Sequence, residues 1–494
     1  VCQGPVEWLL ARGEPDTVAR ILEDVFSHQY TPGSGTKNSG GGGWPQWYMH
    51  PPFENIQSPH SHGDVAVWPV IAVVNYVTAT GDVGLLDKAV PFTQSEPPFA
   101  LTEATATIRE HVDLAIEKLV EKFVPGTALL AYGDGDWNDS LQPARPEMRE
   151  SMVSTWTVEL FFQALRGWAK VMRQRGEDAA AEKHDATADA IRKDFNDRLV
   201  LDDETVGLYL HHNDPERVKV LLHPRDTDTG VKHRLLPMIR GIISGIFTPQ
   251  QAAHHAALIE EHLLAPDGAR LMDRPPKYTG GTMTHFQRLE SASFFGREIG
   301  LMYTHAHLRY AEAMAKLGEP EKLFRALLTI CPVGLQHAVS NANPRQANCY
   351  FSSSDAAFLN RADSEARYED LMRGEVPVNG GWRVYSSGPG IAIGLIVRQW
   401  LGLRRDYDRL VFDPVLTPEH DGLVATVSLL GETCEVTYHV SGEGGGVQRV
   451  TLDGEAVESI GRDDNPYRTG GSCVDAQAFG ERLAGSQKRV EVWC

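Results

Sequence analysis

The sequence predicts a mostly α-helical protein, in which an all-α barrel or toroid is followed by a small antiparallel β-domain. From about residue 5 to about residue 399, amphipathic runs with apolar residues three to four positions apart recur along the chain. After about residue 403 the pattern changes to short β-rich runs with period-two alternation, separated by glycine-rich turns such as 444–446. These two observations divide the chain into a helical domain, 1–402, and a C-terminal β-domain, 403–494.

The helical runs are joined by long connections rich in glycine, proline and aromatic residues. The expected helices span residues 7–25, 64–79, 105–123, 154–175, 179–199, 248–264, 300–315, 319–328 and 391–401. Helix pairs that share one core would form the barrel or toroid. The expected strands span residues 407–414, 423–430, 435–441, 447–452 and 489–493. The β-domain contains no cluster of catalytic residue types, so we expect it to pack against or cap the helical domain.

Composition excludes several classes of protein. The chain has 494 residues, of which 42% are hydrophobic and 23% charged, which is enough to bury large cores. Its formal net charge of -19 and its lack of a long basic run argue against nucleic acid as a partner. No run approaches the ~18 to 20 apolar residues of a membrane helix. The six cysteines show no metal-binding spacing, which predicts reduced thiols in a cytoplasmic protein.

Three long connections carry many aromatic residues, in segments 40–63, 130–148 and 331–387. Loops above ~12 to 15 residues in a compact domain are usually functional or disordered, and these are too aromatic for disorder. Aromatic faces interspersed with polar side chains are typical of a sugar pocket, because the C–H faces of sugars stack on rings. The alternative is that the aromatic residues pack the loops onto the helical body.

The densest group of acidic residues lies in segment 132–141, Tyr-Gly-Asp-Gly-Asp-Trp-Asn-Asp-Ser-Leu. A calcium loop of the EF-hand type is excluded, because its sixth and twelfth places, counted from Asp134, hold Asp139 and Arg145 instead of Gly and Glu. A carboxyl group beside the indole of Trp137 would have a raised pKa, which suits a general acid. A hydrolase needs a second carboxylate, whereas an enzyme in which phosphate attacks the sugar does not.

The run Asp136-Trp137-Asn138-Asp139 resembles the DWND loop of glycoside hydrolase family 94, which contains inverting phosphorylases of cellobiose, chitobiose and β-1,2-glucans. The resemblance implies that Asp139 is the general acid and that Trp137 lines the sugar subsite. Asp136 is expected to bind sugar hydroxyls or to cap the loop. Arg145, six places beyond the acid, takes the place of a phosphate-binding arginine.

Two further segments resemble the same family in the same order. Segment 295–305 matches a family segment in which a glutamate precedes a histidine by seven places, so His305 is implied to contact phosphate. Glu298 is then expected at the substrate site, either touching substrate or orienting His305, and Glu290 is the nearest match to an acidic sugar-subsite residue. Ser387 and Gly388 stand where the family has a phosphate-binding Thr-Gly pair.

The segments 44–47, 61–65 and 381–390 are most similar to the branch of the family that acts on β-1,2-oligoglucans. Asp64 is accordingly expected to bind sugar, although it could equally cap the following helix. Trp47 is expected to stack on sugar, with packing of its own loop as the alternative.

The resemblance covers essentially the entire chain and implies an (α/α)6 barrel followed by a β-sandwich. It implies inverting phosphorolysis of β-linked gluco-oligosaccharides, with inorganic phosphate as co-substrate, to α-glucose 1-phosphate. No metal or organic cofactor is expected, no membrane is expected, and the family is often dimeric. The alternatives are an inverting β-glucan hydrolase and an inactive glucan-binding fragment of a larger synthase or phosphorylase. The family's sugar-binding Arg-Asp pair would lie immediately before Val1, so a truncated chain is expected.

Overall fold

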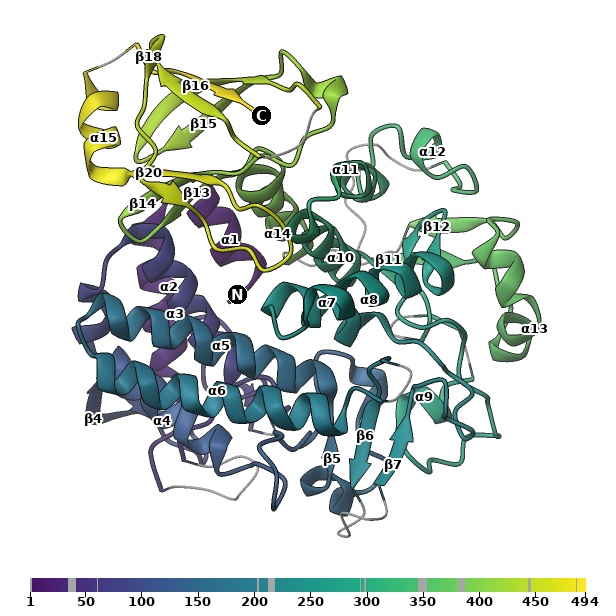
Figure 1. Ribbon diagram of the computed structural model, residues 1–494. Coiled ribbons are helices and arrows are strands. Elements are labelled where there is room, and N and C mark those ends of the chain that lie inside the picture. The colour runs from purple at the N-terminus through teal and green to yellow at the C-terminus, as the bar shows by residue number, and fades with distance from the viewer. Residues whose placement is uncertain are drawn as a thin grey trace.

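The computed structural model describes residues 2–33, 41–59, 61–201, 204–211, 218–293, 295–296, 299–344, 353–380, 387–442, 446–485 and 487–494. Figure 1 shows a larger, mainly helical part and a smaller part at the C-terminal end in which strands predominate. Within the described ranges, no helix is long and apolar enough to cross a membrane. The structure confirms the predicted fold class of a mostly helical protein with a small C-terminal sheet domain.

The helical part combines helices with short two- and three-stranded sheets. Its helices are α1 (Gly4–Ala11), α2 (Pro15–Ser27), α3 (Val67–Thr80), α4 (Ile108–Val120), α5 (Thr155–Gln174), α6 (Asp178–Arg198), α7 (Leu235–Ser244), α8 (Pro249–His262), α9 (Arg288–Ser291), α10 (Thr304–Leu317), α11 (Pro320–Thr329), α12 (Leu335–Ala338), α13 (Arg361–Met372) and α14 (Ser387–Leu395). Its strands are β1 (Trp47–Tyr48), β2 (Gln57–Ser58), β3 (Ala89–Thr93), β4 (Leu101–Thr107), β5 (Met152–Val153), β6 (Leu208–His211), β7 (Val218–Leu221), β8 (Leu264–Ala265), β9 (Gly268–Ala269), β10 (Met302–Tyr303), β11 (Ser353–Ala356) and β12 (Val378–Gly380).

The predicted helix 7–25 is wrong in one respect, because the structure has two helices there, α1 and α2. Gly13 between them has φ +75°, a left-handed conformation that glycine adopts without strain. Pro15 occupies the first turn of α2, where its missing N–H costs nothing. The predicted helix 105–123 begins later, at Ile108, because Thr107 and Glu110 form a capping box that starts α4.

Helix α7 was missed by the sequence analysis. Nine of its ten residues, Leu235 to Ile243, are buried. Apolar residues do recur in it at three-to-four spacing, but the helix has only ten residues and contains Pro237 and Gly241, which both weaken the helical signal in the sequence. α7 packs against α5 and α10 and thus lies inside the helical part.

The C-terminal domain contains two sheets and a helix. The sheets have the orders β13-β14-β20-β19 and β15-β16-β21-β17-β18. Their elements are β13 (Leu403–Asp406), β14 (Arg409–Phe412), β15 (Val424–Leu429), β16 (Glu432–His439), β17 (Arg449–Leu452), β18 (Glu455–Ala456), β19 (Gly461–Arg462), β20 (Ser472–Asp475), α15 (Ala476–Ala484) and β21 (Arg489–Trp493). The prediction of a purely antiparallel domain is wrong at one pair, since β16 and β21 are parallel. A parallel pair needs a long connection, and here the chain passes through α15 and several strands before β21 returns to β16.

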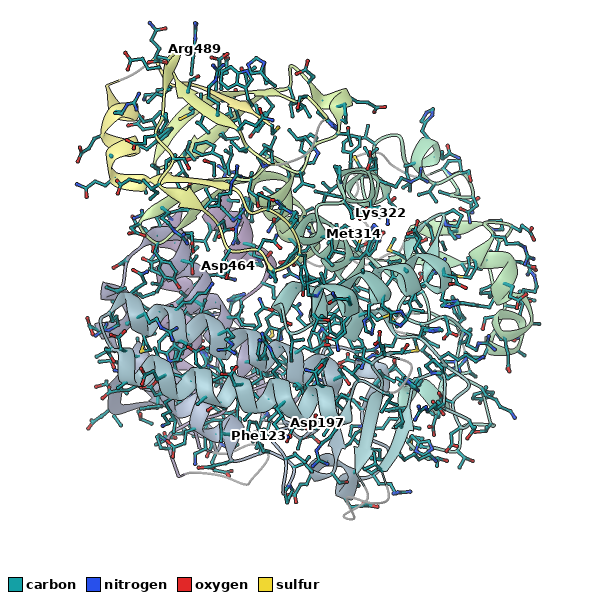
Figure 2. All side chains as sticks on the ribbon, in the orientation of Figure 1. Phe123, Asp197, Met314, Lys322, Asp464 and Arg489 are labelled. Atoms are coloured by element: carbon teal, nitrogen blue, oxygen red, sulfur yellow. The ribbon has the colours of Figure 1, made fainter. Side chains whose placement is uncertain are left out.

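Each part has its own hydrophobic core. The core of the helical part includes Phe161 and Trp168 of α5, and that of the sheet domain includes Phe412, Tyr438 and Phe479, all buried. In Figure 2 the labelled Asp464 marks the loop between β19 and β20 where it approaches the helical part.

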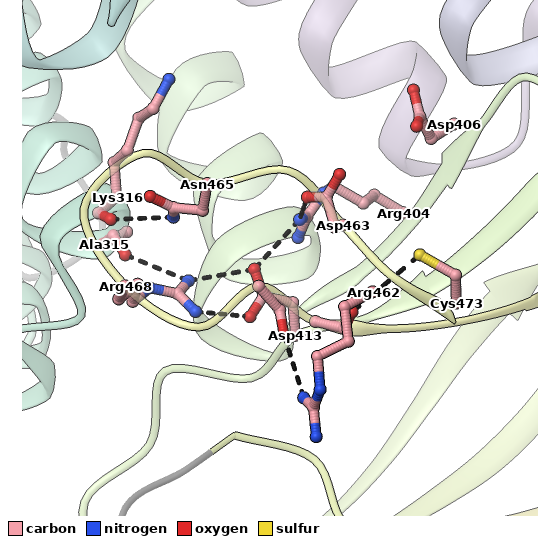
Figure 3. A network of polar contacts seen from close by, with 12 residues as sticks. Ala315, Lys316, Arg404, Asp406, Asp413, Arg462, Asp463, Asn465, Arg468 and Cys473 are labelled. Atoms are coloured by element: carbon pink, nitrogen blue, oxygen red, sulfur yellow. Dashed lines mark hydrogen bonds and ion pairs between the residues drawn. The ribbon is translucent and has the colours of Figure 1, made fainter. Parts of the chain in front are cut away.

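A polar network joins this loop of the sheet domain to the C-terminal end of α10 (Figure 3). Asn465 Nδ2 donates to the Lys316 carbonyl over 3.0 Å, and Arg468 Nη2 donates to the Ala315 carbonyl over 3.4 Å. The Arg468 guanidinium also donates to both carboxylate oxygens of Asp413, over 2.7 and 3.0 Å. The sheet domain thus holds one end of α10, whose other end carries His305.

Candidate active site

The acid loop, defined as residues 132–141, is fixed by backbone hydrogen bonds to its neighbours. The Tyr132 N–H donates to the Met152 carbonyl over 2.8 Å, and the Gly63 N–H donates to the Gly135 carbonyl over 2.9 Å. Near its end, Asp139 begins a 3-10 turn, Asp139–Leu141, which Asn138 caps by accepting from the Ser140 N–H. The loop is therefore an ordered part of the helical body.

Asp139 combines accessibility with a nearby cation. Its side chain is 34% exposed, so a ligand can reach the carboxyl group. Arg288 Nη1, on the short helix α9, lies 3.9 Å from Asp139 Oδ2. The sequence analysis did not single out Arg288, which stands two places before the predicted Glu290.

Trp137 connects the acid loop to the start of α10. Its ring centroid lies 5.0 Å from that of Tyr303, in an edge-to-face arrangement with an interplanar angle of 83°. The His305 ring lies at the same centroid distance, tilted by 56°. The two motifs that the sequence placed more than 160 residues apart are in contact, as a common site requires.

His305 is held in a polar, buried environment. Its Nε2 lies 2.9 Å from Gln3 Oε1, and since an amide oxygen only accepts, Nε2 carries the proton of the neutral ring. Arg309 Nη2 donates to the same Gln3 oxygen over 3.1 Å. Burial, and then the charges of Arg309 and Arg240, hold the pKa of His305 well below its usual range. His305 is therefore a neutral hydrogen-bonding group at physiological pH.

A polar cavity of about 240 Å³ continues from this cluster toward the sheet domain. Its lining includes Gln3 near α1, Arg309 and Lys316 of α10, and Asp463 of the sheet domain. The middle and the C-terminal end of α10 therefore border this polar space.

Asp64 lies beside the acid loop, almost completely buried. Trp68 Nε1 donates to Asp64 Oδ2 over 2.9 Å, so the carboxylate does not cap α3, whose N-cap position is Ala66. Burial, together with the neighbouring charge of Asp136, raises the pKa of Asp64 to about 6.

Asp64→Asn is expected to stabilise the fold at pH 8 but only slightly at pH 4.5. The native carboxyl titrates at about 6 and the ordinary value is 3.8, so wild-type stability falls as pH rises through this window. The full effect is on the order of 3 kcal/mol, and the asparagine oxygen still accepts from Trp68. Urea unfolding at both pH values measures it. A difference between variant and wild type that is the same at both pH values would contradict the assigned burial effect.

Asp136 is not accessible to a ligand in this structure, whereas the sequence analysis predicted a contact with sugar hydroxyls as one possibility. The residue has no exposed surface. Its Oδ1 accepts from the Asn138 N–H over 2.9 Å, and its Oδ2 accepts from Ser154 Oγ over 2.7 Å and from Arg234 Nη2 over 3.2 Å. The alternative prediction, a role within the loop itself, matches these contacts.

Glu290 is also occupied by its own surroundings. The buried carboxylate accepts from the backbone N–H groups of Thr284, His285 and Phe286, the last two over 3.0 and 3.2 Å. The predicted contact with sugar would have to compete with these bonds. We therefore regard Glu290 as the group that shapes the loop before α9.

Arg145 and Trp47 lie at the surface. The Arg145 side chain is 50% exposed, and its Nε donates to Glu147 Oε1 over 2.8 Å, so a phosphate contact requires this pair to open. Trp47 is 51% exposed on β1, which leaves its ring available for stacking. The phosphate contact of Arg145 and the sugar stacking of Trp47 therefore stay predictions.

Ser387 and Gly388 form the first turn of α14, and Gly388 is buried. α14 packs closely on α1, since a Cβ added at Gly390 would lie 2.2 Å from the Gly4 carbonyl oxygen. The side chain of Ser387 and the whole of Glu298 lie outside the described residues. In the part of the chain that the structure describes, no group of three or more His, Cys, Asp and Glu side chains is arranged to hold a metal ion.

Two known protein families match this chain. Residues 26–364 match the catalytic domain of the glycosyl hydrolase 94 superfamily. The chain belongs to this superfamily. Residues 402–493 match the glycoside phosphorylase C-terminal domain.

Two curated members of the superfamily illustrate the similarity. A 1,2-beta-oligoglucan phosphorylase of Listeria innocua serovar 6a is 39% identical over 95% of this chain and 41% of its own length. An N,N'-diacetylchitobiose phosphorylase of Vibrio furnissii is 25% identical over 80% of this chain and 45% of its own length. The chain spans less than half the length of both relatives.

A solved structure titled Sialidase has a related fold. It covers 89% of this chain and 34% of its own chain with a TM-score of 0.52 and 12% sequence identity. This likeness concerns the fold alone.

Sequence reasoning missed three residues of the His305 and Asp139 surroundings, namely Gln3, Arg309 and Arg288. Arg309 lies four positions after His305 and thus on the same face of α10, which is a signal that could have identified it. Gln3 lies outside the motifs quoted above. It is brought to His305 by the packing of α1 on α14 and by the ion pair between Glu7 of α1 and Arg309 of α10.

Proposed function

We propose that the protein is an inverting glycoside phosphorylase. It cleaves β-linked gluco-oligosaccharides, specifically β-1,2-glucans, with inorganic phosphate and releases α-glucose 1-phosphate. The contact of Trp137 with His305 carries this proposal, because it joins the loop of the proposed acid Asp139 to the segment proposed to bind phosphate. The superfamily and the 39% identity to a 1,2-beta-oligoglucan phosphorylase support the reaction and the linkage.

In the proposed reaction, Asp139 protonates the scissile glycosidic oxygen as the sugar leaves. Phosphate attacks C1 from the opposite face, so that the β-linkage becomes an α-phosphate. Phosphate already carries negative charge and needs no base to activate it. One carboxyl group, that of Asp139, is therefore sufficient for the proposed reaction. Trp137, Trp47 and Asp64 would contact the sugar rings and hydroxyls.

Phosphate would be bound by His305, Arg145 and the first turn of α14. The backbone N–H groups at Ser387 and Gly388 lie at a helix N-terminus, where the helix dipole favours an anion. His305 is neutral, so it contributes a hydrogen bond rather than charge. Catalysis would then rest on positioning and electrostatic stabilisation, with no metal or organic cofactor.

The architecture is part of the same proposal. The helices of 1–402 would form an (α/α)6 barrel, with the two C-terminal sheets of 403–494 as a β-sandwich. The hydrophobic core of the sheet domain runs from Leu401 to Val492, which supports a boundary close to residue 402. Glu298 would complete the substrate side of the barrel next to His305, and two chains would associate as a homodimer.

A hydrolase on the same fold is less well supported. It would need a second carboxylate that activates water. The two candidates are Glu290 and Glu298. Glu290 already accepts from three backbone N–H groups, and Glu298 lies outside the described residues.

The synthetic direction tests the proposal and its linkage together. We expect phosphate to be released from α-glucose 1-phosphate only when glucose is added as acceptor, with a β-1,2-linked disaccharide as product in NMR spectra. Use of β-glucose 1-phosphate would contradict inversion, and a different linkage in the product would contradict the substrate assignment. Binding of β-1,2-glucan without turnover in either direction would favour a binding module.

A further inference from the structure

We propose that Arg234 and Ser154 are positioning residues, which set the geometry of the acid loop from inside the protein through Asp136. This inference rests on the proposed function, in which Asp139 is the general acid. It assigns a role to two residues that lie outside every recognised motif.

The contacts at Asp136 form a closed, dry arrangement. Asp136 has no exposed surface and Arg234 is 2% exposed. Arg234 Nη2 and Ser154 Oγ both donate to Asp136 Oδ2, over 3.2 and 2.7 Å. Charge-assisted hydrogen bonds in a water-free environment are strong and directional, so they fix the orientation of this carboxylate.

The fixed carboxylate in turn determines the backbone that carries Asp139. Asp136 Oδ1 accepts from the Asn138 N–H over 2.9 Å. Asn138 Oδ1 then accepts from the Ser140 N–H over 3.2 Å and from Ser140 Oγ over 2.6 Å. The residues on both sides of Asp139 are thus tied to one chain of hydrogen bonds that ends at Arg234 and Ser154.

Both anchors belong to rigid elements. Ser154 is the residue before α5, and Arg234 is the residue before α7. The two helices pack against each other in the core. A site whose supporting groups sit on packed helices is held more tightly than one supported by loops alone.

Among the described residues, Arg234 forms an ion pair with Asp136 and no hydrogen bond with the buried Glu159 of α5. Glu159 is fully buried, and among the described residues neither of its oxygens has a hydrogen-bond partner. Burial raises the pKa of Glu159 well above its usual range, against the opposing effect of Arg240 and Arg234.

The test compares Asp136→Asn with a matched control, Asp267→Asn. The control removes the charge from another buried pair, in which Arg270 Nη2 lies 2.7 Å from Asp267 Oδ2 and the two side chains are 0% and 2% exposed. The substrate is sophorose, the β-1,2-linked disaccharide of glucose. For Asp136→Asn we expect kcat for its phosphorolysis to fall about 100-fold, as a misplaced catalytic group implies, with KM little changed. The limb of the kcat-pH profile that reports the protonated acid should shift as well. Asp267→Asn should lower the melting temperature and leave kcat and the pH profile of the folded enzyme as in the wild type.

Ser154→Ala keeps the test decisive if Asp136→Asn does not fold, because it removes one donor and creates no unpaired charge. We expect at least a tenfold loss of kcat at nearly constant KM. Wild-type kcat and pH profile in a folded Ser154→Ala or Asp136→Asn protein would overturn the inference while the proposed function stands. Absence of phosphorolysis in the wild type would instead refute the proposed function.

Discussion

Asp139→Asn is expected to lower kcat for phosphorolysis of sophorose by about 10²- to 10⁴-fold, the range that a general acid contributes. The asparagine has a similar shape but no proton to donate to the departing oxygen. Sugar binding should remain nearly intact, because the substitution leaves the Trp137 ring, on which the sugar is proposed to stack, unchanged. Release of glucose 1-phosphate measures kcat, and calorimetric titration with sophorose measures binding.

Asp134→Asn is the matched control for this prediction. Asp134 lies in the same loop, its side chain is 13% exposed, and it forms an ion pair with Arg149 over 2.7 Å. The same chemical change there should leave most of the turnover. Equal losses for both variants would point to disruption of the loop, and retained turnover of Asp139→Asn would remove Asp139 from the acid role.

Arg309→Met is expected to destabilise the fold by about 3 to 5 kcal/mol, the usual result of breaking a buried ion pair from one side. Arg309 is 6% exposed and forms ion pairs with Glu7 over 2.5 Å and with Glu312 over 2.8 Å. The substitution leaves two carboxylates without their cation and also removes a donor to Gln3. Urea unfolding measures the stability, and the phosphate KM reports whether His305 has moved.

Lys193→Met serves as the comparison, because the ion pair of Lys193 with Asp197 is largely exposed, at 73% and 55%. Exposed pairs of this kind contribute little. A cost for Arg309→Met no larger than that for Lys193→Met would show that the Glu7 and Glu312 contacts are not important for folding.

Local signals in the sequence predicted most of the helical pattern and the change to strands after about residue 403. The break between α1 and α2 could also have been predicted, because Gly13 and Pro15 are local signals for the end of one helix and the start of the next. The apolar periodicity over 7–25 was given more weight. α7 was not found in this way, because it is short and contains Pro237 and Gly241, two residues that argue against a helix in a sequence. The parallel pairing of β16 with β21 depends on contacts between strands about 50 residues apart, which no local pattern encodes.

The motif DWND singles out the acid loop but does not divide its carboxylates between interior and surface. That division depends on Arg234, which is 98 positions from Asp136 in the sequence, and on the start of α5. Likewise, nothing near Glu290 in the sequence indicates that its carboxylate accepts from the backbone just before it. Residue type and spacing identify chemically competent groups, whereas burial decides which of them a ligand can reach.

The most direct test of the central claim is to follow a short β-1,2-glucan by proton and phosphorus NMR with the protein, in the presence and absence of inorganic phosphate. We predict that α-glucose 1-phosphate accumulates only when phosphate is present and that the first-formed phosphate ester is the α-anomer. Formation of free glucose at the same rate with and without phosphate would contradict the account.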